Sequence, residues 1–224
     1  MYRRVEKNME KIEILGVKID NLTLIKILEK IEYFLLSSRT NYIVTPNPEI
    51  ILTAQNNTEL KNMLNEADLS IPDGVGLKIA SKFKIKERIT GTDLMNNILK
   101  KYINKKFKFI INETGLSSKK EVLQKANVKI DESYPDIIFV GLGCPRQEKW
   151  IKENIAKYPN TRLILTVGGA FDFLTGKQKR APLLFRKIGL EWLWRLIKQP
   201  KRYKRIFNAT IKFLFKALLC LKKS

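Results

Sequence analysis

The sequence predicts an α/β protein in which helices cover both faces of a mostly parallel β-sheet. Short runs of β-branched and aromatic residues alternate along the chain with longer segments whose apolar residues recur at helical spacing. The segment Asp136–Val140 ends in four consecutive apolar residues, which is typical of a strand buried on both faces. Because parallel strands need helical crossovers between them, this alternation indicates the α/β class.

The first half of the chain is expected to begin with a short hairpin, in which Ile12–Ile14 and Val17–Ile19 flank Gly16. A helix should follow over Leu22–Leu36, with Asn21 or Thr23 as its N-cap. The other elements expected in this half are the strand Asn41–Thr45, which Pro46 and Pro48 stop, the helix Glu49–Asn65, the strand Leu69–Ile71, the short helix Val75–Lys82, and a helix from a Thr92 cap to about Asn104.

The second half continues the alternation without an internal repeat or a low-complexity linker. The whole chain has 224 residues, of which 44% are hydrophobic, and this suits one domain with a real core and an appended segment. The elements expected here are the strand Phe107–Ile111, a helix from a Ser117 or Ser118 cap to about Ala126, the buried strand, the helix Gln147–Ala156 entered through Pro145, and the last strand Arg162–Val167.

The absence of histidine from the sequence excludes several chemistries. Ser-His-Asp and Cys-His nucleophile pairs, HExxH zinc sites and histidine proton shuttles all need that residue. General base catalysis would then depend on Asp or Glu, with Arg, Lys or the backbone assisting. The two cysteines, Cys144 and Cys220, form no CxxC pair, so no disulfide framework is expected and a reducing cytoplasm is favoured.

Positive charge is concentrated at the C-terminal end of the chain. The formal net charge is +21, and residues 177–224 contain 15 Lys and Arg against a single acid, Glu191. Such a segment favours an anionic partner, which could be nucleic acid, phospholipid or pyrophosphate, although a solvated basic helix is the alternative. No apolar segment follows Met1–Lys7, and no stretch of about 18 uncharged apolar residues occurs, so neither a signal peptide nor a membrane span is expected.

Candidate site residues follow four of the expected strands. Because ligands of such sheets bind at the carboxyl ends of the strands, four polar or glycine-rich turns at one edge indicate a nucleotide-type site. Alternatives remain for each turn, since the first could be an ordinary strand-to-helix cap and Asp73 could be an N-cap. The four segments are Thr45–Glu49, Pro72–Gly76, Gly141–Glu148 and Gly168–Asp172.

Several well-known nucleotide motifs are missing from these turns. The sequence has no GxxxxGK[ST] loop and no complete GxGxxG, which disfavours an ATPase and a dinucleotide dehydrogenase. It also has no DxD, so a carboxylate pair that grips a metal–diphosphate is not expected.

The C-terminal segment has the pattern of an interfacial helix. Glu191–Leu196 is rich in tryptophan, and residues 201–221 predict a basic amphipathic helix. A helix of this kind favours a lipid interface, while packing on a partner subunit and binding of nucleic acid are the alternatives. The apolar stripe would consist of Phe207, Ile211, Leu214, Leu218 and Leu221, and the opposite side of Arg205, Asn208, Lys212, Lys216 and Lys223.

Taken together, the motifs resemble the WecG/TagA/CpsF glycosyltransferase family. The resemblance implies a Rossmann-like core over residues 1–190 and a membrane-associating helical appendage over residues 191–224. The chain is shorter than the family pattern between Lys106 and Asp136. The matching segments are Thr45–Glu49, Pro72–Gly74, Arg88 with Gly91–Met95, Gly141–Glu148, Gly168–Asp172, Lys179–Pro182 and Gly189–Leu193.

The resemblance also implies an activity. Members would transfer N-acetylmannosamine, or a related N-acetylhexosamine or uronic acid, from a UDP sugar to undecaprenyl-diphosphate-linked N-acetylglucosamine. The transfer would invert the anomeric centre, need neither metal nor cofactor, and serve the synthesis of a teichoic acid-like cell-wall polymer. The protein would then be cytoplasmic and peripherally attached to the inner face of the cell membrane. A homo-oligomer stays open, and no nucleic acid partner is expected.

Roles for individual residues follow from the same resemblance. Asp73 would be the general base, and Thr45 and Asn47 would orient the sugar. The nucleotide would be held by Gly141, Gly143, Gln147, Gly168, Gly169 and Asp172. The charge of the diphosphate would be neutralised by Arg88, Arg195, Arg202 and Arg205. The lipid diphosphate and the membrane surface would be bound by the tail arginines together with Lys212 and Lys216. The rival interpretations are a catalytically weak relative that only docks on the membrane and binds lipid diphosphate, and a nucleic-acid-binding protein, which rests on charge alone.

Overall fold

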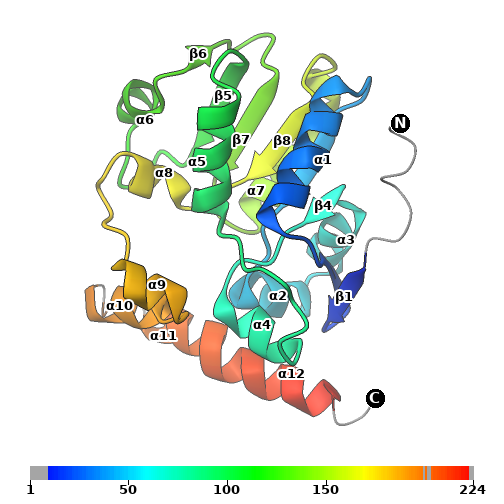
Figure 1. Ribbon diagram of the computed structural model, residues 1–224, viewed down its shortest axis with the longest axis vertical. Coiled ribbons are helices and arrows are strands. Elements are labelled where there is room, and N and C mark those ends of the chain that lie inside the picture. The colour runs from blue at the N-terminus through cyan, green and yellow to red at the C-terminus, as the bar shows by residue number, and fades with distance from the viewer. Residues whose placement is uncertain (1–9, 199, 201–202, 222–224) are drawn as a thin grey trace.

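A six-stranded parallel sheet forms the centre of the molecule, with helices on both of its faces (Figure 1). This computed structural model describes residues 10–198, 200 and 203–221. The strand order is β4-β3-β8-β7-β5-β6, and every neighbouring pair is parallel, so the predicted α/β, Rossmann-like class is confirmed. The strands are β3 (Asn41–Val44), β4 (Leu69–Ser70), β5 (Lys106–Ile111), β6 (Lys129–Ile130), β7 (Ile137–Gly141) and β8 (Leu163–Thr166).

The predicted N-terminal hairpin is present and lies against the β4 edge of the sheet. Its strands, β1 (Lys11–Ile14) and β2 (Val17–Asp20), pair antiparallel around a two-residue turn in which Leu15 and Gly16 both have positive φ. The Oδ2 atom of Asp20 accepts a hydrogen bond of 2.8 Å from the Ser70 amide of β4. The hairpin therefore satisfies a backbone donor that an uncovered edge strand would leave exposed.

Apolar side chains pack on both faces of the sheet, as the buried strand predicted. On one face the rings of Phe107, Phe109 and Phe139 stack under α1, α5, α6 and α8. On the other face Ile138 and Ile164 pack against α7. The helices of this core are α1 (Leu24–Leu36), α2 (Pro48–Ala54), α3 (Thr58–Glu66), α4 (Val75–Ala80), α5 (Gly91–Lys101), α6 (Lys119–Ala126), α7 (Arg146–Asn154) and α8 (Ala170–Leu174), with a 3-10 turn at Ile155–Lys157.

The single helix predicted over Glu49–Asn65 is wrong, because two helices, α2 and α3, occupy that stretch. The chain leaves the helix after Ala54, and Asn57 starts α3 by accepting a hydrogen bond of 2.9 Å from the Leu60 amide. The local cause is the run of polar residues before α3, since asparagine side chains bond the backbone in competition with a continuous helix.

The predicted Thr92 cap is also wrong, because α5 begins earlier and ends earlier. Thr90 is the N-cap, and its Oγ1 accepts a hydrogen bond of 3.1 Å from the Asp93 amide. Thr92 already lies in the first helical turn, where it is buried. The helix ends at Lys101 rather than near Asn104. A cap needs an extended backbone, and sequence spacing did not separate two threonines two residues apart.

The C-terminal residues form a run of short helices that returns to the core (Figure 1). The last of them, α12, lies along α2 and α4 and buries Phe213 completely and Ala217 almost completely. The apolar stripe predicted for a lipid interface included neither residue, and Leu214 of that stripe is partly buried against the same apolar cluster. The helices are α9 (Leu183–Lys187), α10 (Glu191–Lys198), α11 (Tyr203–Phe207) and α12 (Phe213–Leu221).

A wide π-helical turn explains why the predicted stripe did not contain the two inward residues. It spans Asn208–Lys212, between α11 and α12, and places about one additional residue in the helix. Residues before and after the turn therefore do not follow one 3.6-residue period. Of the predicted apolar stripe, Phe207, Ile211 and Leu218 are nevertheless exposed, by 52%, 59% and 48%. Among the helices that the structure describes, none is both long and apolar enough to cross a bilayer.

Candidate active site

The predicted site residues follow four adjacent strands of the sheet. Thr45 follows β3, Asp73 comes shortly after β4, Gly143 follows β7 and Gly168 follows β8. The order β4-β3-β8-β7 is contiguous, and all four strands are parallel, so these positions share the carboxyl edge of the sheet. The expected gathering of the four turns at one edge is therefore present.

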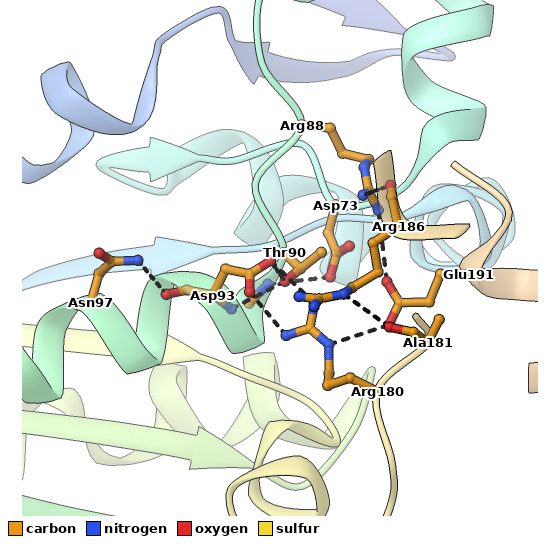
Figure 2. A network of polar contacts seen from close by, with 10 residues as sticks. Asp73, Arg88, Thr90, Asp93, Asn97, Arg180, Ala181, Arg186 and Glu191 are labelled. Atoms are coloured by element: carbon orange, nitrogen blue, oxygen red, sulfur yellow. Dashed lines mark hydrogen bonds and ion pairs between the residues drawn. The ribbon is translucent and has the colours of Figure 1, made fainter. Parts of the chain in front are cut away.

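Asp73 is not the N-cap of the following helix. Gly74, with φ of 116°, occupies the cap position of α4, and the Asp73 carboxylate turns toward α5 instead (Figure 2). Its Oδ2 accepts a hydrogen bond of 3.3 Å from the Gly91 amide, while its own amide donates to the Pro46 carbonyl at 2.9 Å. The side chain is half-buried, so the fold fixes a carboxylate at the sheet edge without covering it.

Thr45 lies next to the same glycine. A Cβ atom at Gly91 would be 3.3 Å from Thr45 Oγ1, a tight contact, so the start of α5 lies directly against this hydroxyl. The hydroxyl of Thr45 is buried and donates to the Thr166 carbonyl at 3.1 Å. Asn47 acts as the N-cap of α2, where its Oδ1 accepts from the Ile50 amide at 2.9 Å. The strand-to-helix cap that we considered for this turn is thus confirmed for Asn47.

The four glycines of the other two turns differ in their surroundings. Gly143 and Gly168 have positive φ values of 76° and 53°, and a Cβ atom at either position, or at Gly169, would meet nothing within 4 Å. A Cβ atom at Gly141 would instead lie 2.5 Å from the Phe171 ring and 2.8 Å from the Gly168 carbonyl. Three of the glycines therefore leave room for a ligand, whereas Gly141 allows α8 to pack on β7.

A buried pair of side chains, Gln147 and Glu148, connects the two glycine turns. The Gln147 Nε2 donates to Glu148 Oε1 at 2.8 Å, and its Oε1 accepts from the Gly168 amide at 3.1 Å. Burial raises the pKa of the Glu148 carboxyl, although hydrogen bonds to Gln147, to its own backbone and to Cys144 oppose this effect. The amide of Gln147 is thus fixed in one orientation beside the Gly168 turn.

Asp172 lies farther along the same edge, in the first turn of α8. Its Oδ1 accepts a hydrogen bond of 2.9 Å from Ser117 Oγ, and its carbonyl accepts from the Gln178 amide at 2.8 Å. The side chain is half-exposed, so its carboxylate remains accessible from the surface.

A network of charged side chains borders Asp73 (Figure 2). Arg180 donates to both oxygens of Asp93, at 2.9 and 3.2 Å, and lies 3.5 Å from Glu191. Burial alone would raise the pKa of Asp93, but hydrogen bonds from Arg180 and Thr90 outweigh it and hold that pKa below its usual value. The network ties the segment before α9 and the start of α10 to the first turn of α5.

Among the predicted diphosphate and membrane residues, the structure describes the side chains of Arg88, Lys212 and Lys216. Arg88 donates to the Arg186 carbonyl at 2.9 Å and lies 3.9 Å from Glu191, so it belongs to the network beside Asp73. Lys212 and Lys216 are exposed on the C-terminal helix. Of the three tail arginines, Arg202 lies outside the described residues, and the structure describes only the backbone of Arg195 and Arg205.

Comparison with known proteins shows which family this chain belongs to. The family model for glycosyl transferases of the WecG/TagA/CpsF family matches residues 12–135 and 113–224, which together span nearly the whole chain. The chain belongs to this family. The resemblance inferred from the motifs is thus confirmed.

Two relatives from Staphylococcus aureus, strains MW2 and NCTC 8325 / PS 47, carry the same name. Each is called N-acetylglucosaminyldiphosphoundecaprenol N-acetyl-beta-D-mannosaminyltransferase. Each is 32% identical to this chain over 242 residues, which cover 93% of this chain and 92% of the relative.

Within this glycosyl transferase, four residues near Asp73 received no role from the sequence. Asp93, Arg180 and Glu191 occur in segments that carry the family resemblance, but nothing in their spacing showed that they meet. The fourth, Arg186, supplies the carbonyl that Arg88 binds. Asp93 and Arg180, and likewise Arg88 and Arg186, are almost a hundred positions apart in the sequence. Only the opposite charges of Asp93 and Arg180 could have suggested that these segments meet. Among the described residues, no group of three or more Cys, Asp and Glu side chains is placed to hold a metal ion.

Proposed function

We propose that this member of the family is an inverting transferase that uses a UDP sugar. It would move N-acetylmannosamine, or a related N-acetylhexosamine or uronic acid, to undecaprenyl-diphosphate-linked N-acetylglucosamine for a teichoic acid-like wall polymer. The names of its relatives support this acceptor and this sugar. The observation that carries the chemistry is the half-buried Asp73 carboxylate, which the Gly91 amide orients at the carboxyl edge of the sheet.

Asp73 acts as the general base of this proposal. The acceptor hydroxyl gives its proton to the carboxylate while its oxygen attacks the anomeric carbon of the donor sugar. The bond from that carbon to the diphosphate breaks, and UDP leaves with the electron pair. Because attack and departure occur on opposite faces in one displacement, the anomeric centre inverts. The hydroxyl of Thr45 and the Nδ2 atom of Asn47 orient the reacting sugar.

The glycine turns bind the donor nucleotide. The open sides of Gly143, Gly168 and Gly169 let the diphosphate approach the backbone amides, and the start of α7 adds its partial positive charge. Gln147 fixes the Gly168 turn that forms this surface, with Gly141 supporting it and Asp172 at its rim. Arg88 neutralises the charge that develops on the leaving diphosphate, so neither metal nor cofactor is required.

The C-terminal appendage, residues 191–224, places the enzyme on an anionic membrane from the cytoplasmic side. Its exposed apolar residues enter the lipid interface, and Lys212 and Lys216 meet acidic head groups. The arginines at 195, 202 and 205 would close over the acceptor diphosphate.

Residues 1–190 form the catalytic core. A non-catalytic docking protein would not need the Asp73–Gly91–Thr45 arrangement, which favours the enzyme. Nucleic acid is not a partner, and a homo-oligomer stays a prediction.

A turnover assay tests this function. The full chain is incubated with a soluble N-acetylglucosamine lipid-diphosphate analogue and a panel of UDP sugars, with UDP release and the product measured in the presence of excess EDTA. UDP-N-acetylmannosamine should give the fastest transfer, and the product should have an inverted anomeric configuration. Transfer from no UDP sugar would overturn the proposal. Transfer that needs added magnesium or manganese would overturn its metal-free form.

A further inference from the structure

The turn after α4 holds an aromatic residue in a strained conformation. Lys82 and Phe83 are consecutive left-handed residues, with φ of 51° and 62°. The turn is fixed by backbone hydrogen bonds, from the Phe83 amide to the Lys78 carbonyl at 2.8 Å and from the Lys82 amide to the Ile79 carbonyl at 2.9 Å. Its shape is therefore set by the end of the helix.

This conformation is unfavourable for a bulky side chain and gains nothing from packing. Left-handed backbone is rare for large residues, whereas glycine and asparagine adopt it readily. The ring of Phe83 is 68% exposed, so burial in the core does not compensate for the strain. Strain that the fold keeps without a packing reason points to a function outside the folded chain.

The position of the turn suggests what that function is. The α4 helix that carries it packs along α12, where Gly76 lies against the Phe213 ring, and Ala80 and Ala217 belong to the same apolar cluster. The exposed apolar surface of α12 contains Phe215, Leu218 and Leu219, which are 67%, 48% and 47% exposed. The turn thus continues from a helix that packs directly on α12, the helix that carries part of the surface assigned to the membrane by the proposed function.

The charge around Phe83 matches the same partner. Lys82 and Lys84 flank the ring, and both are exposed. Within residues 10–198, 200 and 203–221, no ion pair involves either lysine, whereas the neighbouring Lys86 lies 3.6 Å from Glu10. An aromatic ring between two lysines suits the boundary between acyl chains and anionic head groups.

We propose that the Lys82–Phe83–Lys84 turn is a second membrane contact, contributed by the core rather than by the appendage. The inference rests on the proposed docking of α12, and its ligand is an anionic lipid bilayer. Phe83 enters the interface while the two lysines bind lipid phosphates. Two separate contacts prevent the core from rolling about the α12 axis.

The second contact also sets the height of the active site above the bilayer. The α4 helix starts two residues after Asp73 and ends three residues before Phe83. Its six residues span about 9 Å at the usual helical rise. If the turn is held at the lipid surface, Asp73 is therefore held about the length of α4 away from that surface, where the acceptor's head group lies.

Replacing Phe83 by asparagine separates docking from a structural role. Asparagine tolerates the left-handed backbone, so Phe83→Asn should raise Tm by a few degrees. Loss of the ring should weaken binding of the full chain to vesicles of phosphatidylglycerol and phosphatidylcholine by roughly tenfold. The matched control is Leu36→Asn, because Leu36 is 74% exposed at the end of α1, next to the amino edge of the sheet. That variant should bind as the unmodified chain does.

The possible results are distinguishable. Unchanged vesicle binding by Phe83→Asn, while the unmodified chain binds, would overturn this inference and leave the docking of α12 intact. A lowered Tm would show that the ring packs structurally, and an altered sedimentation coefficient would assign the turn to a subunit contact; either result overturns it. Absence of binding by the unmodified chain would refute the proposed docking itself, and this inference with it.

Discussion

Arg180 holds Asp93 through two parallel hydrogen bonds, Nη1 to Oδ1 at 2.9 Å and Nη2 to Oδ2 at 3.2 Å. The same carboxylate accepts a hydrogen bond of 2.6 Å from the Thr90 hydroxyl, which caps α5. Gly91 lies between Thr90 and Asp93 in the sequence, and its amide orients the Asp73 carboxylate. The Arg180–Asp93 ion pair therefore connects two parts of the chain. One is the segment before α9, which leads into the appendage, and the other is the start of α5, whose backbone positions Asp73.

The first prediction concerns this ion pair. Arg180→Lys keeps the charge but loses the two-pronged geometry, which a lysine cannot reproduce. We expect a loss of about 1–2 kcal/mol in unfolding free energy, because the pair is only partly buried, and a reduced turnover. Chemical denaturation and a double-mutant cycle with Asp93→Asn measure it. A coupling energy near zero would contradict the structural role of the pair.

A pH titration provides the control for the ion pair. The pKa of Asp93 is lowered in the folded state, so its contribution to stability is complete at neutral pH and is lost as pH falls through that lowered pKa. Asp93→Asn should therefore narrow the gap between the stabilities at neutral and acidic pH. An unchanged gap would mean that the carboxylate is not stabilised in this way.

The second prediction concerns the proposed base itself. Asp73→Asn is nearly isosteric and can still accept the Gly91 hydrogen bond, so Tm should stay within a degree or two. Loss of a general base should lower kcat by roughly 10²–10⁴-fold. Asp131→Asn is the control, since Asp131 follows β6, the edge strand farthest from β4, and is paired there with Lys106 at 2.8 Å; it should leave kcat unchanged. Near-normal turnover of the Asp73 variant would remove this residue from the mechanism.

The third prediction concerns the buried carboxyl of Glu148. Its pKa is raised by burial, so its contribution to stability is present below the ordinary pKa of glutamate and is lost as pH rises through the raised value. Glu148→Gln has no proton to lose and still accepts the Gln147 hydrogen bond. Its Tm should match that of the unmodified chain in acid and exceed it by a margin that grows as pH rises through the raised pKa and is constant above it, with little change in turnover.

Glu153→Gln serves as the control for this pH series, because Glu153 is on the same helix with an exposed side chain. Its Tm should follow that of the unmodified chain at every pH. If Glu148→Gln also follows it, the buried carboxyl stays ionised without cost and the argument from burial is wrong.

Most of the fold could be predicted because it depends on local patterns. A few neighbouring residues determine the buried strand at Asp136–Val140 and the turn around Gly16, and both elements are present. Thr45, Asp73, Gly143 and Gly168 could be expected at one edge because parallel strands place their carboxyl ends together. These inferences needed only sequence order and periodicity.

The errors occurred where tertiary contacts decide the outcome. Whether Thr90 or Thr92 caps α5 depends on where the loop that follows α4 reaches the sheet, which no local pattern records. The π-helical turn shifted the phase of the C-terminal helix, so Phe213 entered the core unpredicted. The meeting of Arg180 with Asp93 spans 87 positions of the chain, a separation at which spacing carries no information.

The fourth prediction follows from the buried position of Phe213. Phe213→Ala removes a fully buried ring and should cost about 3–5 kcal/mol, which for a chain of this size lowers Tm by roughly 6–20 °C. Phe215→Ala is the matched control, because its ring is 67% exposed and should contribute less than about 0.5 kcal/mol. Equal effects of the two substitutions would show that α12 does not pack on the core as described.

The fifth prediction concerns the exposed apolar stripe of the C-terminal helix. Deleting the appendage cannot test docking cleanly, because the deletion also removes Phe213 from the core. Substituting serine for both Phe207 and Ile211 avoids this difficulty, since both side chains are more than half exposed and their loss should leave Tm unchanged.

Full insertion of one such side chain into lipid contributes about 1.5–3 kcal/mol, so even half of the smaller value at each of the two positions should lower the affinity of the double variant for anionic vesicles by roughly tenfold. Binding of the unmodified chain should also weaken at high salt, because the contribution of Lys212 and Lys216 is screened. Sedimentation of vesicles at low and high salt measures both effects. If the double variant binds as tightly as the unmodified chain, the stripe does not meet lipid. A change in its oligomeric state would then assign the stripe to subunit packing.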